Sequence, residues 1–286
     1  MVESRLDVGG GVVFWSLADW TDRPRLAAAF RALGLGSFVP EPRPPSAALK
    51  DALESVLGGP RVLVRPLATR DGFAVVTEDR GLAQNQYATA LTARAAGDPP
   101  ALSFDPWDAR AVRVEEAFRA QLGRVPANQL SAALVKVIAF LGGTRLRPSG
   151  AVYWLPGHRL GPWADVAQAV EQAADGRPSA VYVLRHRLDA DAVRAVRDAV
   201  VAEVQAEAAR IRDEVLAGDL GGRALETRQR YAADLREKVL LYEDLLDVGL
   251  KGLHAALDEA DQAAATAALL LSSTAPESGS LLAGAR

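Results

Sequence analysis

The C-terminal third of the chain, residues 190–271, repeats apolar side chains every three or four residues, and this pattern limits the fold most narrowly. Such spacing places the apolar side chains along one face of a helix, and that face must be covered for the helix to be stable. Glycines at 218, 221 and 222 interrupt the pattern. A short glycine-rich break favours antiparallel packing of two helices. We therefore predict a long antiparallel helical (coiled-coil) hairpin with its bend between Gly218 and Gly222.

Apolar residues from both predicted helices form the seam of this hairpin. They are Val193, Val200, Val204 and Ile211 in the first helix, and Leu235, Val239, Tyr242, Leu246, Leu253 and Leu257 in the second. The second run is longer than the first, so its apolar stripe beyond about Leu253 needs a further partner. The sequence therefore predicts that the helical arm mediates self-association or docks a partner protein.

The residues before the hairpin predict a globular body of helices and antiparallel hairpins, and thus an α+β fold. Residues 11–17 are β-rich, which is typical of a buried strand. The segments 71–72 (DG) and 147–150 (RPSG) are turn signals between apolar runs. We expect an N-terminal α+β subdomain over 1–100, a helix-hairpin-helix-strand subdomain over 101–188, the helical hairpin over 189–272 and a disordered tail over 273–286.

The chain has no cysteine, which excludes disulfides, thiolate zinc sites and cysteine nucleophiles and fits a reducing compartment. No run approaches the ~20 apolar residues of a membrane span, and residues 1–7 carry charges where a signal peptide would be apolar. We therefore expect a cytoplasmic protein that does not enter a membrane. The formal net charge is −3, so any contact with nucleic acid must come from a local basic patch.

Arginine and aromatic residues gather between positions 145 and 187. The alternation of side chains along a strand places Arg145 and Arg147 on one face, and likewise Arg185 and Arg187 on one face of another strand. Arginines beside exposed aromatic rings can hold the phosphates and stack the bases of single-stranded nucleic acid. The candidate residues for such a basic sheet are Arg145, Arg147, Arg159, Arg185, Arg187, Tyr153 and Trp154. The alternative interpretation places the aromatic residues in the core and the arginines on a solvated rim.

Catalytic and metal-binding motifs do not stand out in the sequence. The three histidines, His158, His186 and His254, have no recognisable third ligand beside them. The glycines at 9–11 precede a strand and lack the Lys-Ser/Thr that follows in a phosphate-binding loop. We therefore expect no catalytic residue, no cofactor and no metal site.

Two stretches of the chain carry a resemblance to other proteins. One is residues 146–156 (LRPSGAVYWLP), which follow an amphipathic helix, and the other is residues 227–246, which contain Lys238 and Tyr242. In these stretches the chain resembles an uncharacterised group of bacterial and phage proteins with a globular α+β front and a coiled-coil tail. The resemblance extends over about residues 126–257. It implies this architecture, and it implies neither an established activity nor functional residues.

Three hypotheses about function remain open at this point. The first is a non-enzymatic interaction or assembly protein that uses its coiled-coil arm for self-association or for docking in a larger complex. The alternative is a nucleic-acid-binding protein that uses the basic sheet, with the arm for dimerisation. An enzyme of unknown class is the third. Exposed aromatic rings among clustered arginines would favour the second hypothesis.

Overall fold

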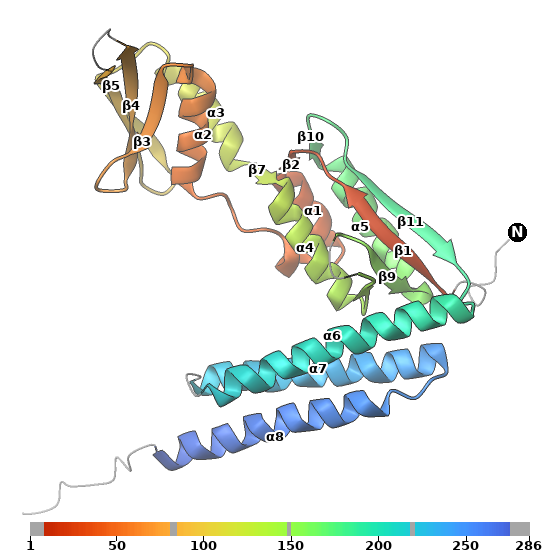
Figure 1. The fold of residues 1–286 in the computed structure, drawn as a ribbon. Helices are drawn as coiled ribbons and strands as arrows, with labels where there is room; N and C mark the ends of the chain where they lie inside the picture. The colour runs from red at the N-terminus through yellow and green to blue at the C-terminus, as the bar shows by residue number, and fades with distance from the viewer. Residues whose placement is uncertain (1–8, 81–84, 148–149, 218–220, 275–286) are drawn as a thin grey trace, which may run out of the picture. The chain divides into compact units, whose positions relative to one another are not determined.

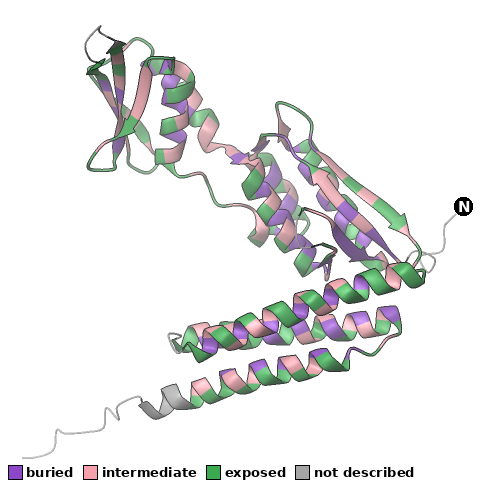
Figure 2. Ribbon diagram, in the orientation of Figure 1, coloured by how far each residue is buried: buried purple, intermediate pink, exposed green. Residues whose placement is uncertain are grey.

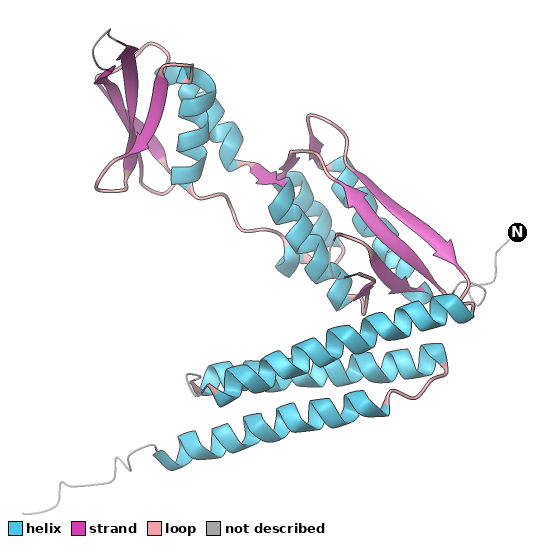
Figure 3. Cartoon of the chain, in the orientation of Figure 1, coloured by secondary structure: helices cyan, strands magenta, loops and turns pink. Residues whose placement is uncertain are grey.

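The computed structural model describes residues 9–80, 85–147, 150–217 and 221–274 (Figure 1). Helices and antiparallel sheets both contribute, which confirms the α+β class (Figure 3). The chain divides into two compact units. The first unit contains residues 1–14, 138–162 and 182–286, and the second contains residues 15–137 and 163–181. These units differ from the consecutive segments expected from the sequence, because strands from distant parts of the chain pair with one another.

A four-stranded sheet belongs largely to the first unit, with the strand order β11-β1-β9-β8. Its strands are β1 (Gly10–Ser16), β8 (Thr144–Arg145), β9 (Tyr153–Pro156) and β11 (Ala180–His186), and the 3-10 helix η2 (Gly157–Arg159) follows β9. The predicted hairpin of β8 and β9 is confirmed, with Arg145 opposite Tyr153. Residues 148 and 149 of its turn lie outside the described residues. Val12 of β1 lies opposite Trp154 of β9, so these two side chains share a face of the sheet.

Three helices form the rest of the first unit: α6 (Ala190–Leu216), α7 (Gly222–Leu246) and α8 (Lys251–Thr274). The side chain of Asp189 caps α6 by accepting a hydrogen bond from the amide of Ala192, as the sequence predicts. The glycine break predicted between the first two helices is also present. Residues 218–220 of that break lie outside the described residues.

The predicted hairpin of two long helices is wrong, because the second helix ends at Leu246 and a third helix folds back (Figure 1). Asp247 takes a left-handed backbone conformation with φ 50°, which stops α7. The apolar spacing continues across this break through Leu246, Leu250, Leu253 and Leu257, so the sequence looks like one continuous helix. The structure is therefore a three-helix bundle.

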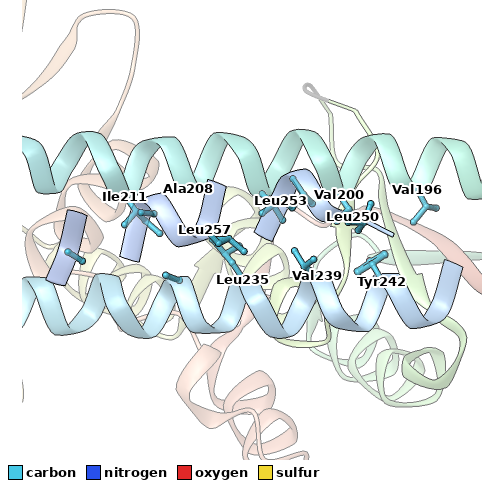
Figure 4. Packing of buried hydrophobic residues seen from close by; sticks show 14 of the residues in the cluster. Val196, Val200, Ala208, Ile211, Leu235, Val239, Tyr242, Leu250, Leu253 and Leu257 are labelled. Carbon is cyan, nitrogen blue, oxygen red and sulfur yellow. The ribbon is translucent and has the colours of Figure 1, made fainter. Parts of the chain in front are cut away.

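The predicted seam residues pack together inside this bundle, as Figure 4 shows for several of them. Val193 is partly buried against the cluster, and the other nine predicted residues are buried in it. Each helix of the bundle alternates between buried and exposed residues along its length (Figure 2). Because α8 supplies Leu253 and Leu257 to this core, the stripe that seemed to need a partner is covered within the chain. The unequal lengths of the predicted helices therefore give no reason to expect self-association.

Glu243 of α7 holds the start of α8 in place. One carboxylate oxygen accepts a hydrogen bond from the amide of Leu250 at 2.6 Å, and the other lies 3.1 Å from Nε2 of His254. These contacts, the amide first and His254 second, lower the pKa of Glu243 from its ordinary value of 4.5. Because the folded pKa lies below the unfolded one, the stabilisation is complete above the ordinary value and is lost as the pH falls through the folded value.

We expect Glu243→Gln to lower the melting temperature of the protein at neutral pH. We expect this difference to shrink as the pH falls below the ordinary value of 4.5 and through the lowered pKa of the folded carboxylate, where the wild-type side chain becomes protonated. Thermal melts followed by circular dichroism between neutral and acidic pH measure this difference. Glu237→Gln is the matched control, because Glu237 is an exposed residue of the same helix. A difference that is the same at every pH would show that the Glu243 carboxylate does not stabilise the bundle.

The second unit contains two further antiparallel sheets, with the strand orders β10-β2-β7 and β3-β4-β5-β6. Its strands are β2 (Trp20–Asp22), β3 (Val62–Pro66), β4 (Gly72–Arg80), β5 (Asn85–Ala96), β6 (Ala101–Asp105), β7 (Arg124–Pro126) and β10 (Ala174–Asp175). Its helices, some of which continue into the first unit along the chain, are α1 (Arg23–Ala32), η1 (Gly36–Phe38), α2 (Pro45–Leu57), α3 (Ala111–Leu122), α4 (Ala127–Phe140) and α5 (Leu160–Gln172).

The sheet β3-β4-β5-β6 and the helices α2 and α3 enclose one hydrophobic cluster of this unit. The hairpin predicted at Asp71–Gly72 is confirmed as β3 and β4. The long strand β5 has no apolar alternation in residues 85–90, which are all exposed, so the sequence does not predict it. No helix among the residues that the structure describes is long and apolar enough to span a membrane.

Candidate functional site

The structure separates the arginines of the predicted basic sheet. Arg145 lies on β8 and Arg185 on β11, and these are the opposite edges of the four-stranded sheet. Three strand spacings of about 4.8 Å place these edges roughly 14 Å apart. Arg147 lies just past the end of β8, and Arg187 lies just past the end of β11. Arg159 is exposed in η2. The four strand arginines are therefore two pairs at the two edges of the sheet.

Tyr153 and Trp154 of β9 are buried and do not form a platform for bases. The guanidinium carbon of Arg145 lies 5.6 Å from the ring centroid of Tyr153, and Nη2 of Arg145 lies 3.3 Å from its hydroxyl. The indole of Trp154 donates a hydrogen bond to Nε2 of His186 at 3.2 Å. The burial of Tyr153 and Trp154 thus supports the interpretation that these aromatic residues belong to the core.

Trp154 reaches His186 by crossing the strand between them. A Cβ atom on Gly10 of β1 would lie 2.2 Å from Cζ2 of the Trp154 ring, so the ring passes over a residue that has no side chain. On the bundle side, the Trp154 ring centroid lies 5.6 Å from that of Tyr242. Trp154 therefore joins β1, β9, β11 and the bundle in one core.

Tyr242 of α7 is fully buried, and its hydroxyl donates to the carbonyl of Gly142 at 2.9 Å. Burial is the main cause that raises the pKa of this phenol well above 10, and the charge of Glu203 adds to it. The phenol therefore stays protonated at neutral pH and acts as a hydrogen-bond donor to the backbone.

Lys238 of α7 lies at the centre of a polar cluster that sequence reasoning missed. Its ammonium donates to the carbonyl of Gly143 at 2.7 Å and to Oε1 of Glu203 at 2.6 Å. The hydroxyl of Thr144 donates to Oε2 of Glu203 at 2.6 Å. Each of these groups has a partner within the first unit, so the cluster joins α6 and α7 to the start of β8. No spacing in the sequence indicates it, because its members lie up to 95 residues apart.

We expect Lys238→Met to destabilise the protein by about 2–3 kcal/mol, because it leaves the Glu203 carboxylate and the Gly143 carbonyl without their main partner. Urea unfolding measures the change in free energy. The double variant Lys238→Met with Glu203→Gln removes the unpaired charge and should recover part of this loss. Equal stability of wild type and Lys238→Met would mean that the ion pair contributes nothing to folding.

The edge strand β11 carries the most exposed apolar side chains of the sheet in the first unit. Tyr182 is 47% exposed and Leu184 is 59% exposed. The ring of Phe14 on β1 stacks on that of Tyr182, with centroids 4.9 Å apart and planes 21° apart. We call Phe14, Tyr182 and Leu184 the β11 surface. Alternation places Phe14 on the same face as Val12, which packs against the bundle, so the bundle covers one part of this face and leaves the β11 surface open.

Sequence reasoning did not identify the β11 surface. The alternation of Tyr182 and Leu184 is visible in the sequence, but the same alternation in an inner strand would be buried. Only the strand order shows that β11 is an edge. Metal-binding clusters of three or more His, Asp or Glu residues are absent from the described part of the chain.

Comparison with known proteins identifies a family. Over residues 9–276 the chain matches the family described as "Family of unknown function (DUF6744)", and the chain belongs to this family. No curated protein and no solved structure matches the chain. The resemblance to bacterial and phage proteins stays a prediction.

Proposed function

We propose that this protein is a non-enzymatic interaction or assembly protein that docks a partner protein on the β11 surface. The observation that carries the proposal is the exposure of Tyr182 and Leu184 side by side on an edge strand. Contiguous apolar surface on an edge strand is the kind of surface that a partner covers. The partly buried polar side chains of the first unit, such as Lys238, support the fold, and the exposed apolar ones are available for binding.

The helical bundle has a supporting role in this proposal. Its core includes Trp154 and packs against Val12, and both belong to the sheet that carries the β11 surface. The stacked ring of Phe14 limits the freedom of the Tyr182 ring, so little side-chain entropy is lost when a partner binds. A rigid sheet thus presents the docking residues. The expected cytoplasmic location stays a prediction.

We expect Leu184→Glu to abolish capture of the partner from native lysate without changing the melting temperature, because a charge on an exposed docking residue opposes binding and not folding. Pull-down with the tagged full chain, with and without nuclease, measures this loss. Leu240→Glu is the matched control, because Leu240 of α7 is 57% exposed and lies outside the β11 surface. Equal recovery of the same proteins by wild type and Leu184→Glu would contradict the proposed function.

Nucleic-acid binding is a second candidate function, because β11 carries both the exposed ring of Tyr182 and, on its other face, the exposed Arg185. An exposed aromatic ring can stack a base, and a guanidinium group at the same strand can hold a phosphate. This candidate expects partners that are lost on nuclease treatment, and it expects labelled single-stranded DNA to bind less well as salt rises. Binding that persists after nuclease treatment and that high salt does not weaken would exclude it.

A further inference from the structure

The connection between η1 and α2 contains a proline segment, residues 39–45 (VPEPRPP) (Figure 1). Every residue from Val39 to Pro44 is a proline or precedes one. A proline ring fixes φ at about −65°, and the residue before a proline favours extended backbone. Val39 has φ −64° and ψ 126°, and Pro44 has φ −57° and ψ 134°, so both ends take the polyproline II conformation. Residues 39–44 are therefore a polyproline II segment.

One edge of the proline segment is attached to the second unit. A polyproline II helix has three residues per turn, so residues three apart lie along one edge. Pro40 and Arg43 are partly buried and share such an edge. Nε of Arg23 donates to the carbonyl of Pro40 at 2.9 Å. The guanidinium carbon of Arg43 lies 5.0 Å from the ring centroid of Trp20, and the same group forms an ion pair with Asp51. The side chain of Arg43 is only 12% exposed, so this edge faces the protein.

The other two edges of the proline segment face away from the protein. Glu41 and Pro44 lie along one of them, and Pro42 and Pro45 lie along the other. All four of these residues are exposed. Pro45 is the first residue of α2, and the polyproline II residues before it set its position. Two neighbouring edges with three proline rings are therefore accessible to a partner.

A surface of this kind has a characteristic binding partner. Proline has no amide hydrogen to donate, and a polyproline II helix has no internal hydrogen bonds, so its carbonyls remain acceptors. A groove lined by aromatic rings packs against the proline rings, and its indole or hydroxyl groups donate to the carbonyls. The proline segment loses little conformational freedom on binding, because its φ angles are fixed and one edge is already attached.

From this geometry we infer that the proline segment docks in an aromatic-lined groove of a partner protein. The Pro42–Pro45 edge and the Glu41–Pro44 edge enter the groove, and the Pro40–Arg43 edge stays on the second unit. The inference goes beyond the proposed function, because the proline segment shares no residue with the β11 surface. Nucleic acid is a poorer occupant, since the prolines supply no amide donors for its phosphates.

Purified WW domains and Src-homology 3 domains are the probes, because both have grooves lined by aromatic rings. Isothermal titration of a panel of these domains with the full chain measures binding. We expect at least one domain to bind, and we expect a proline-rich peptide ligand of that domain to compete. Pro42→Ala with Pro45→Ala should weaken binding at least about tenfold, because a few anchor side chains carry most of an interface's energy.

Control variants assign the binding to the proline segment. Pro178→Ala changes an exposed proline of the same unit outside the segment and should bind as the wild type does. Thermal melting by circular dichroism checks that the double variant is folded. If it melts early, Pro42→Ala alone replaces it, because Pro42 lies outside α2 and is exposed. Binding that persists in the folded variant, or that Pro178→Ala weakens equally, would overturn the inference.

The remaining outcomes are distinguishable from one another. Failure of every domain to bind would overturn the inference and leave the proline segment as a rigid spacer between α1 and α2. Sedimentation showing a dimer that the double variant dissociates would overturn it in favour of a second copy of the chain. Leu184→Glu should bind the domains as the wild type does. The inference therefore stands or falls separately from the proposed function, which capture through Leu184 tests.

Discussion

We expect Leu235→Asp to unfold the three-helix bundle. Leu235 is buried in the apolar core that α6, α7 and α8 share. An aspartate there loses the transfer free energy of the leucine and buries a carboxylate without a partner, which together cost about 4 kcal/mol or more. Because a domain is stable by only about 5–15 kcal/mol, this loss removes much of the stability of the first unit. Circular dichroism at 222 nm during thermal melting should show lower helicity and an earlier transition.

Leu240→Asp is the control for this prediction, because Leu240 lies five residues further along α7 and is exposed. We expect its effect on the free energy of unfolding to stay within the range of ordinary surface substitutions, about 0.5 kcal/mol, so that the melting curve changes little. Similar melting curves for wild type and Leu235→Asp would mean that the bundle core does not form in solution.

We expect Trp154→Ala to destabilise the protein by about 3–5 kcal/mol, as is usual when a fully buried large aromatic residue is truncated. The variant loses the contact with the Tyr242 ring and leaves His186 without its indole donor. It also leaves an empty space over Gly10, which has no side chain to fill it. Guanidinium unfolding measures the change in free energy. The transition is monitored by far-ultraviolet circular dichroism, because this signal comes from the backbone and does not depend on the tryptophan that the variant removes.

Trp154→Phe separates the contribution of the ring contact with Tyr242 from that of the hydrogen bond to His186. Phenylalanine retains part of the ring contact and cannot donate to His186, so its cost should lie between that of the wild type and that of alanine. If Trp154→Ala kept the wild-type melting temperature and lost binding of single-stranded DNA, Trp154 would be an exposed stacking residue, as the basic-sheet hypothesis expected.

The helical seam shows which features of this protein the sequence patterns predict and which they miss. The spacing of Val200, Val204 and Ile211, and of Leu235 and Val239, predicted which residues are buried, because only one face of a helix can meet a core. The same spacing gave no sign that α7 ends at Leu246. The connection of residues 247–250 has about as many residues as one helical turn, so the apolar spacing in the sequence continues across it unchanged.

The basic sheet shows which features of this protein the sequence patterns do not predict. Alternation predicted correctly that residues such as Arg145 and Arg185 lie in strands, because strands have a fixed period of two. It could not predict that these strands are the two edges of one sheet, since strand order depends on pairing between residues that are far apart in the chain. The sequence therefore left open whether Trp154 is a stacking residue or a core residue, and the structure places it buried in an inner strand.

The sequence by itself determined the properties that depend on neighbouring residues: the cap of α6 at Asp189, the hairpin of β8 and β9, and the buried face of each bundle helix. Only the tertiary structure decided that α8 folds back over the seam and that β11 is an edge strand with Tyr182 and Leu184 exposed. The physical reason is that helix caps and periodicity are local properties of the backbone and side chains. Exposure depends on which distant segments of the chain cover a surface, and in this protein the bundle covers Val12 and Trp154 but leaves the β11 surface open.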